Sequence, residues 1–317
     1  MMDTRIKYRH VQCFLEVYRQ RSVGKAAEIL ETTQPAVSKK LKELEDMLGA
    51  RLLERGKSSV ELTPCGEVFI KYASASMTAL RDGARSVAEA QLKSRSRLSI
   101  GVIPAAAAHL LPAIVRRFRD ADLDVTLNIV TSDNNELLDK LRQGEVDLVI
   151  GSPGEPEQLH GMTFEQLCSE PLSMVVRPGH PLLRGDFEPA RVGSFTLLCP
   201  PRHTRLHSLI ERYLLTAGAS IGNDRIETQS DLFAREFLRQ GDAVWAVPRS
   251  VVQHELDNRE LVELPLPQQE VRSSLGITVR QDRSMSVALQ MFIDSCRTAA
   301  ISQPEANPNP RVPRLVR

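Results

Sequence analysis

A short basic segment offers the clearest small-molecule chemistry in the chain. Two guanidinium groups, Arg202 and Arg205, flank His203 and Thr204. A guanidinium binds a carboxylate through two parallel hydrogen bonds, so this segment suits a ligand with two or three carboxylates. A basic loop that only faces water is an equal alternative. His203 and His207 have a spacing that metal ligands use, but no further ligand accompanies them, so no metal site is predicted.

A second group of side chains suits contact with nucleic acid. Gln34 and Ser38 are polar residues in the first turns of an expected helix, and Lys39 and Lys42 follow them. Side-chain amides and hydroxyls at a helix start can hydrogen-bond base edges, and lysines bind phosphates. Each lysine alone is equally well explained as a solvated surface charge. The position of Gln34 and Ser38 favours a direct role in DNA recognition.

The charge distribution agrees with this division of chemistry. Residues 1–97 contain 18 Lys and Arg against 12 Asp and Glu, whereas the rest of the chain contains 23 against 28. A basic N-terminal part followed by an acidic remainder is typical of a nucleic-acid-binding domain joined to a sensor domain. Such a split also occurs as ordinary surface variation, so it supports the motifs and does not replace them.

The N-terminal side chains are expected on a compact set of short elements. Apolar spacing predicts a helix over 7–20 and a second one after Ser22, and Thr33 is expected to cap a third helix that Gly49 ends. Segments 51–55 and 60–62 flank Gly56 and predict a β-hairpin. A long helix, 64–92, follows Thr63; its thin apolar pattern favours pairing with a second copy of the same helix.

The remaining residues alternate between strand and helix patterns. This alternation predicts an α/β fold with a mostly parallel sheet, in which ligands bind beyond the carboxyl ends of strands. Strands are expected at 98–103, 125–130, 146–150, 172–177, 196–199, 244–247 and 274–279, and helices at 105–119, 134–143, 206–217, 231–240 and 285–299. The candidate ligand residues at these strand ends are Pro104, Ala105, Thr131, Ser132, Pro201, Arg202, His203, Thr204, Arg205 and Gln229.

The N-terminal residues closely resemble the DNA-binding domain of the LysR family. The matching positions include Ser22, Ala26, Ala27, Leu30, Thr33, Gln34, Pro35, Ala36, Val37, Ser38, Leu44, Glu45, Leu48, Gly49, Leu52, Arg55, Leu62, Thr63, Pro64 and Gly66. Leu53 departs from the pattern, because the family more often has Phe there. The resemblance implies that Thr33, Gln34, Pro35 and Ser38 lie at the DNA, with Lys39, Lys42 and Arg55 nearby, and the hairpin adds Lys57 at its tip.

The resemblance also implies a domain organisation. A winged helix-turn-helix would occupy 1–64, a linker and dimerisation helix 65–92, and an effector domain of the periplasmic-binding-protein type 93–302. Lobe I of that domain would comprise about 97–168 and 270–302, and lobe II about 169–269. The proline-rich end, 303–317, is expected to be a disordered tail.

The function implied is that of a cytoplasmic transcriptional regulator, more often an activator, that acts as a homodimer or homotetramer. Its partners would be promoter DNA, a small carboxylated effector and RNA polymerase, with no cofactor and no membrane. Residues 5–81 look most like regulators of aromatic-acid catabolism, those of the protocatechuate branch above all, which implies a carboxylated ring-cleavage product as effector. A LysR-type regulator of another operon, with another effector, is the main alternative.

Other classes of protein fit the sequence less well. No hydrolase, zinc-protease or nucleotide-binding motif is present, so an enzyme is not expected. A solute-binding protein would leave the N-terminal ninety residues unexplained, and the N-terminus lacks an apolar signal-peptide core. A redox sensor is a remote alternative, because the five cysteines are scattered singly: Cys13, Cys65, Cys168, Cys199 and Cys296.

Overall fold

The computed structural model describes residues 6–55, 59–92, 96–156, 158–219, 222, 224–266, 271–281 and 285–301. The chain forms two compact units that divide close to residue 95. Among the residues that the structure describes, no helix combines the length and the apolarity of a membrane span. The expected tail, 303–317, lies outside the described residues.

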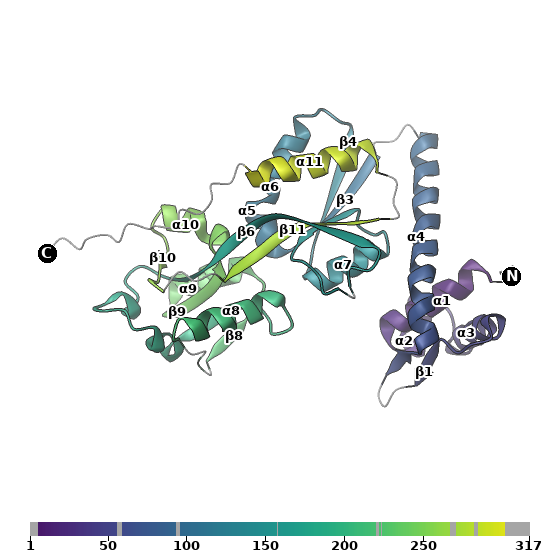
Figure 1. Ribbon diagram of the computed structural model, residues 1–317, viewed down its shortest axis with the longest axis horizontal. Helices are drawn as coiled ribbons and strands as arrows, with labels where there is room; N and C mark the ends of the chain where they lie inside the picture. Colours follow the sequence, from purple (N-terminus) through teal and green to yellow (C-terminus); the bar gives the residue numbers. More distant parts are fainter. Residues whose placement is uncertain are drawn as a thin grey trace. The chain divides into compact units, whose positions relative to one another are not determined.

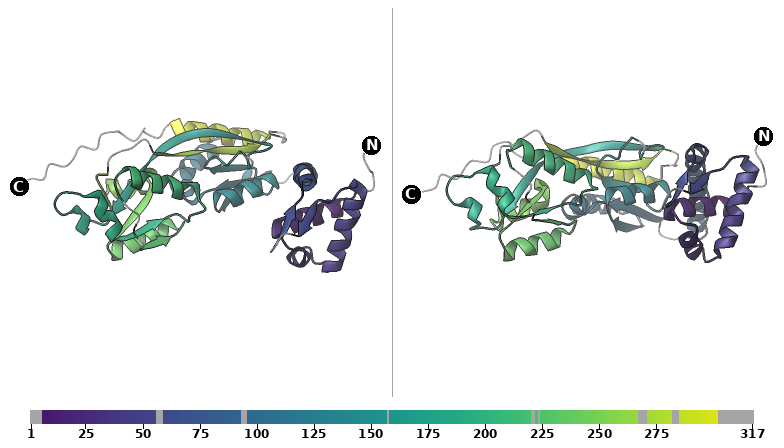
Figure 2. Two further views of the ribbon diagram at one scale, coloured as in Figure 1. Left: turned by 60° about the horizontal axis from the view of Figure 1, so that its bottom comes forward. Right: turned by 90° about the horizontal axis from the view of Figure 1, so that it is seen from below.

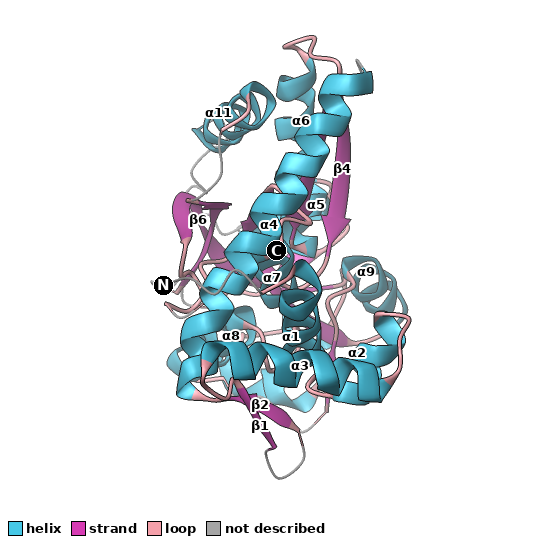
Figure 3. Ribbon diagram, turned by 90° about the vertical axis from the view of Figure 1, so that its right-hand side faces the viewer, coloured by secondary structure: helices cyan, strands magenta, loops and turns pink. Residues whose placement is uncertain are grey.

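Three short helices build the first unit: α1 (Tyr8–Gln20), α2 (Val23–Ile29) and α3 (Gln34–Leu48) (Figure 3). The predicted caps are confirmed, since Ser22 accepts a hydrogen bond at the start of α2 and Thr33 accepts one from Ala36 N–H at 3.4 Å. Gly49 ends α3 in the left-handed conformation, with φ 67°.

The three helices pack through small and branched residues. Ala26 and Ala27 are buried and let α2 approach its neighbours closely, while Phe14 and Leu44 fill the other half of the core. Leu48, the last residue of α3, is 36% exposed and lies outside this core. This is a helix-turn-helix arrangement.

A hairpin and a long helix complete the unit. Strands β1 (Leu53–Arg55) and β2 (Val60–Leu62) pair antiparallel as predicted, and α4 runs over Pro64–Leu92. Thr63 joins them, because its hydroxyl accepts a hydrogen bond from Gly66 N–H at 3.0 Å and donates one to Arg51 C=O at 2.6 Å. The hairpin forms the wing beside the three helices.

The second unit is a two-lobed α/β structure on one continuous sheet with strand order β4-β3-β5-β11-β6-β9-β7-β8, and with β10 paired to β6 (Figure 1). The parallel strands of lobe I are β3 (Ser96–Val102), β4 (Val125–Thr131) and β5 (Leu148–Gly151). Those of lobe II are β7 (Thr196–Cys199), β8 (Arg225–Glu227) and β9 (Ala243–Pro248), with β10 (Val262–Glu263) at the side.

Two long antiparallel strands cross from one lobe to the other, as the teal and yellow-green ribbons of Figure 2 show. They are β6 (Met162–Val176) and β11 (Arg272–Arg280). Along β6, Glu170 still pairs with Ser273 of β11, while Leu172 already pairs with Pro248 of lobe II. Only the end of β6 was predicted, as 172–177, so the expectation of a short strand is wrong.

Helices cover the sheet of each lobe. Lobe I has α5 (Pro104–His109), α6 (Leu111–Arg119), α7 (Asn134–Arg142) and α11 (Val287–Ile301); lobe II has α8 (Arg205–Thr216), α9 (Asp231–Gln240) and α10 (Gln253–Asp257), besides short 3-10 turns at Pro181–Leu183, Pro189–Ser194 and Arg249–Val252. The single helix expected over 105–119 is two helices, because Pro112 cannot donate a backbone hydrogen bond. Phe118 of α6 meets Phe292 of α11 in the lobe I core.

Candidate nucleic-acid interface and ligand cleft

The helix α3 presents one polar face that is open to solvent. All six predicted contact residues of this helix and its cap are exposed: Thr33, Gln34, Pro35, Ser38, Lys39 and Lys42. The opposite face carries the buried Val37 and Leu44. Among the described residues, the side chains of Gln34, Ser38, Lys39 and Lys42 have no hydrogen-bond or ion-pair partner, so all four are available to a ligand.

One acidic side chain holds the wing against the end of α3. Glu45 Oε1 accepts hydrogen bonds from the backbone N–H groups of Leu52 at 2.7 Å and Leu53 at 3.2 Å. A carboxylate that accepts two N–H groups fixes a backbone position strongly. Glu45 was not singled out from the sequence, although it lies in the run that carries the family resemblance.

The structure describes the predicted contact residues of the wing only in part. Arg55 is the last residue of β1, but its side chain and the whole of Lys57 lie outside the described residues. Their proposed contact with DNA therefore stays a prediction.

The helix α4 exposes a row of large apolar side chains. Val68, Tyr72, Leu80 and Val87 are between 57% and 70% exposed. Their spacing of four, eight and seven residues keeps them near one side of the helix. An exposed apolar row of this kind is typical of a surface that packs against another helix.

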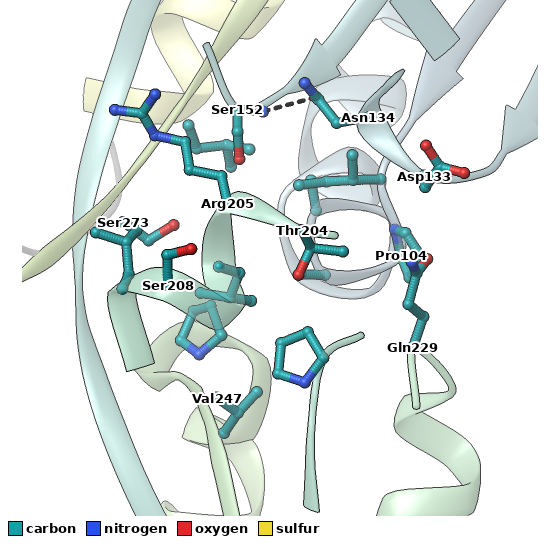
Figure 4. A pocket seen from close by; sticks show the side chains of 18 of the residues that line it. Pro104, Asp133, Asn134, Ser152, Thr204, Arg205, Ser208, Gln229, Val247 and Ser273 are labelled. Carbon is teal, nitrogen blue, oxygen red and sulfur yellow. Dashed lines mark hydrogen bonds between the residues drawn. The ribbon is translucent and has the colours of Figure 1, made fainter. Parts of the chain in front are cut away.

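A cleft of about 520 Å³ lies within the second unit, and residues of both lobes line it (Figure 4). The lobe I wall comes from the starts of α5 and α7 and from Ser152 after β5. The lobe II wall comes from the start of α8, from the loop before α9 and from β9. Asn134 stiffens the first wall, because its side-chain oxygen accepts the N–H of Ser152 at 3.0 Å.

The cleft unites most of the ligand residues that the sequence analysis selected. Seven of them line it: Pro104, Ala105, Arg202, His203, Thr204, Arg205 and Gln229. Thr131, Ser132 and Pro201 are not among its lining residues; the hydroxyl of Ser132 instead donates to Glu136 of its own lobe. The strand-end rule therefore found the cleft but placed two residues of the β4 end too close to it.

Both predicted arginines of the cleft already have carboxylate partners. Arg202 Nε lies 3.3 Å from Glu227, and Arg205 lies 3.8 Å from Glu155 of the opposite lobe. All four side chains are at least one-third exposed, so these ion pairs contribute little to stability. An anionic ligand can therefore replace Glu227 or Glu155 as the partner of these arginines at a small cost in free energy.

Three side chains form what is called below the hinge cluster: His109, Glu170 and Ser250. Glu170 Oε1 lies 3.1 Å from His109 Nε2, and its other oxygen accepts from the Ser250 hydroxyl. His109 Nδ1 donates to the carbonyl of Ala105 at 2.6 Å, which leaves Nε2 to carry the second proton of an imidazolium. Burial lowers the pKa of His109, but Glu170 outweighs burial, and the net pKa is raised. Burial likewise raises the pKa of Glu170, whereas His109 holds the net value below its ordinary one.

Several lining residues escaped the sequence analysis. These are His109, Glu170, Arg212, Asp231 and Trp245. Arg212 follows Arg205 on α8 after seven residues, a helical spacing that could have indicated the same face. His109 and Glu170 had no such signal, because only the fold brings α5 to the crossover strand.

Comparison with known proteins decides the family. Residues 8–67 match the family described as "Bacterial regulatory helix-turn-helix protein, lysR family", and residues 92–301 match "LysR substrate binding domain". The chain belongs to the LysR family. It is therefore a DNA-binding transcriptional regulator with an effector-binding domain, not an enzyme and not a solute-binding protein.

LysR-type relatives match nearly the whole chain. The transcriptional regulator PcaQ of Agrobacterium fabrum is 38% identical over 95% of this chain and 97% of its own length. An uncharacterized regulator of Escherichia coli, YdcI, is 34% identical over 94% of this chain and 97% of its own length. The crystal structure of CbnR, a LysR family transcriptional regulator, has the same fold, with a TM-score of 0.57 at 21% identity over 93% of this chain and 99% of CbnR.

Proposed function

We propose that this LysR-type regulator activates an operon of aromatic-acid catabolism, in the protocatechuate pathway, when a small carboxylated effector binds between its lobes. The observation that carries the proposal is the gathering of seven predicted ligand residues in one cleft of about 520 Å³. Arginine side chains on its lobe II wall suit one or more carboxylates. Similarity to PcaQ and the resemblance of residues 5–81 support the pathway.

The DNA-binding half of the proposal rests on α3. Its exposed face would lie in the major groove, with Gln34 and Ser38 on base edges and Lys39 and Lys42 on phosphates. Thr33 and Pro35 would approach the backbone, and Arg55 and Lys57 of the wing would follow it. The protein would act through RNA polymerase at the same promoter.

Assembly into a homodimer or homotetramer completes the proposal. The exposed row Val68, Tyr72, Leu80 and Val87 of α4 suits pairing with the same row of a second copy. Two α3 helices would then reach two half-sites of a partly palindromic operator. Effector binding would shift the balance between two arrangements of this assembly only by its difference in affinity for them.

An effector from another metabolic operon is the second candidate. The cleft's arginines suit any small carboxylate, and 38% identity to PcaQ leaves room for a different ligand. Calorimetry with 3,4-dihydroxybenzoate and with 3-carboxy-cis,cis-muconate, the substrate and the tricarboxylate product of protocatechuate ring cleavage, separates the two: binding of either supports the pathway, and no binding of either at millimolar concentration contradicts it.

The arginine assignment is tested by Arg202→Ala with Arg225→Ala as its matched control. Both arginines approach Glu227, but only Arg202 lines the cleft. We expect Arg202→Ala to retain promoter binding and to lose at least tenfold in effector affinity, since a charge-assisted hydrogen bond is removed. Arg225→Ala should keep both. Equal loss in the two variants, or none in Arg202→Ala, would refute the cleft assignment.

The DNA face is tested by fragment retardation with the protein's own promoter region. Ser38→Ala should weaken binding to this fragment by about 1–3 kcal/mol and leave binding to unrelated DNA unchanged. Lys39→Ala should weaken binding to both fragments and reduce its salt dependence. If Ser38→Ala weakened both fragments alike, a base-reading role for Ser38 would be wrong.

A further inference from the structure

Most carboxyl groups that line the cleft are already bonded. Among the described residues these groups are Asp133, Glu155, Glu170 and Asp231. Asp133 accepts two backbone N–H groups at the start of α7, each at 3.0 Å. Glu155 faces Arg205, and Glu170 belongs to the hinge cluster. Asp231 alone has neither a hydrogen-bond nor an ion-pair partner within the described part of the chain.

The local structure does not require Asp231 as a helix cap. Ser230 fills that position on α9, because its hydroxyl accepts the N–H of Phe233 at 3.2 Å. Asp231 is the first residue of the helix proper and lines the cleft. Its carboxyl group therefore makes no capping hydrogen bond to α9 and is available to a ligand.

The nearby cations do not neutralise Asp231 by direct contact. Arg235 is bonded to Glu255 and to the carbonyl of Val251, and its guanidinium lies 5.6 Å from the centre of the Trp245 ring. His109 is bonded within the hinge cluster. Burial raises the pKa of Asp231, and the charges of Arg235 and His109 offset only part of that rise.

Asp231 is half-buried and lines the cleft without a hydrogen-bond donor from the described protein groups. A ligand that fills this part of the cleft must therefore supply a donor, because a carboxylate that loses solvent without gaining a donor is unfavourable. A second carboxylate placed there would be repelled by Asp231 and by Glu170. Hydroxyl and ammonium groups are the donors that small metabolites carry. Both would leave the ligand's carboxylate free to face the arginines of α8.

We propose that Asp231 selects effectors that carry a hydrogen-bond donor in addition to their carboxylate, and that the natural effector is a hydroxylated carboxylic acid rather than an acid with carboxylates alone. This inference rests on the proposed function, because it takes the cleft as the effector site. It divides the candidates of an aromatic-acid pathway into two chemical groups. Hydroxylated ring acids have the donor, and their ring-cleavage polycarboxylates do not.

The test is calorimetry on the full-length protein with three probes: 3,4-dihydroxybenzoate, benzoate and 3-carboxy-cis,cis-muconate. The wild-type protein should bind the dihydroxy acid about tenfold or more tightly than either donor-free acid, since a hydrogen bond to a charged group contributes about that factor. Asp231→Asn should weaken the dihydroxy acid and strengthen the polycarboxylate. Opposite signs in one variant cannot arise from a general loss of folding.

A matched control is Asp257→Asn, an exposed carboxylate on α10 that does not line the cleft. It should leave all three affinities unchanged. Tighter wild-type binding of the polycarboxylate than of the dihydroxy acid would overturn this inference but keep the proposed function, and it needs no variant to be stable. No binding of any probe would overturn both. An unchanged affinity ratio in Asp231→Asn would overturn the role of Asp231 alone.

Discussion

Replacing Gly66 by alanine should disrupt the packing between the wing and the first turn of α4. A methyl group on Gly66 would lie 2.1 Å from the carbonyl oxygen of Leu52 and 3.0 Å from a methyl group of Leu62. The nearer atom belongs to the backbone, so no change of rotamer can relieve the contact. The chain before the wing and the first turn of α4 would have to separate by about 1 Å.

The expected cost follows from three contributions. Overpacking of this kind costs about 1–3 kcal/mol. The hydrogen bond from Thr63 N–H to the same Leu52 oxygen, 3.0 Å long, would be strained, which costs about 1 kcal/mol more. Alanine in place of glycine within a helix returns about 1 kcal/mol. The N-terminal unit should therefore lose about 2 kcal/mol of its free energy of unfolding.

Amide hydrogen exchange on the full-length protein measures this loss, because peptides of the N-terminal unit are followed separately from the rest. Exchange in α1–α3 should accelerate about 30-fold. Gly83→Ala, on the same helix, is the matched control: nothing lies within 4 Å of its added methyl group, so it should stabilise slightly. The reasoning is refuted if Gly66→Ala exchanges no faster than Gly83→Ala.

Two further predictions concern titratable groups. The pKa of His109 is raised from 6.5, so its contribution to stability is complete below that pH and is lost as pH rises, whereas that of Glu170 is lowered from 4.5, so its contribution is lost as pH falls. The difference in melting temperature between wild type and Glu170→Gln, followed by Trp245 fluorescence, should be largest between pH 4.5 and 6.5, and a flat difference would contradict the pairing. Burial raises the pKa of Cys168 to about 12 and that of Cys296 to about 12, so we expect promoter binding to survive dilute peroxide; a loss that Cys168→Ser prevents would restore the redox-sensor alternative.

The sequence pattern predicted correctly those helices, strands and caps whose apolar spacing or capping residues lie within a few positions of one another. The strand Thr196–Cys199 and the helix Asp231–Gln240 have the expected bounds, and the caps Ser22 and Thr33 make the expected bonds. In each case the deciding contacts lie within a few residues, so the sequence pattern contains them.

Features that depend on distant partners were missed. The part of β6 before Leu172 contains Glu165, Glu170 and Pro171, which disfavour a strand by themselves, and only its long pairing with β11 makes it one. The hinge cluster has the same cause, because His109 and Glu170 are far apart in sequence. The β4 end was assigned to the cleft by a general rule on strand ends, and the actual turn at Ser132 directs its hydroxyl to Glu136.

The last described helix closes the first lobe, and this has a consequence for synthesis of the chain. Lobe II is built from one continuous stretch, but the core of lobe I needs Phe292 and Cys296 of α11 beside Phe118. On the ribosome, lobe II can be complete while lobe I still exposes its apolar sheet face. Lobe II ends near Glu263 of β10 and α11 ends at Ile301, so at about 5–20 residues per second that interval lasts roughly two to eight seconds. A premature stop codon before α11 would therefore leave lobe I, whose first strands are synthesised earliest, without its complete core, and would leave lobe II intact.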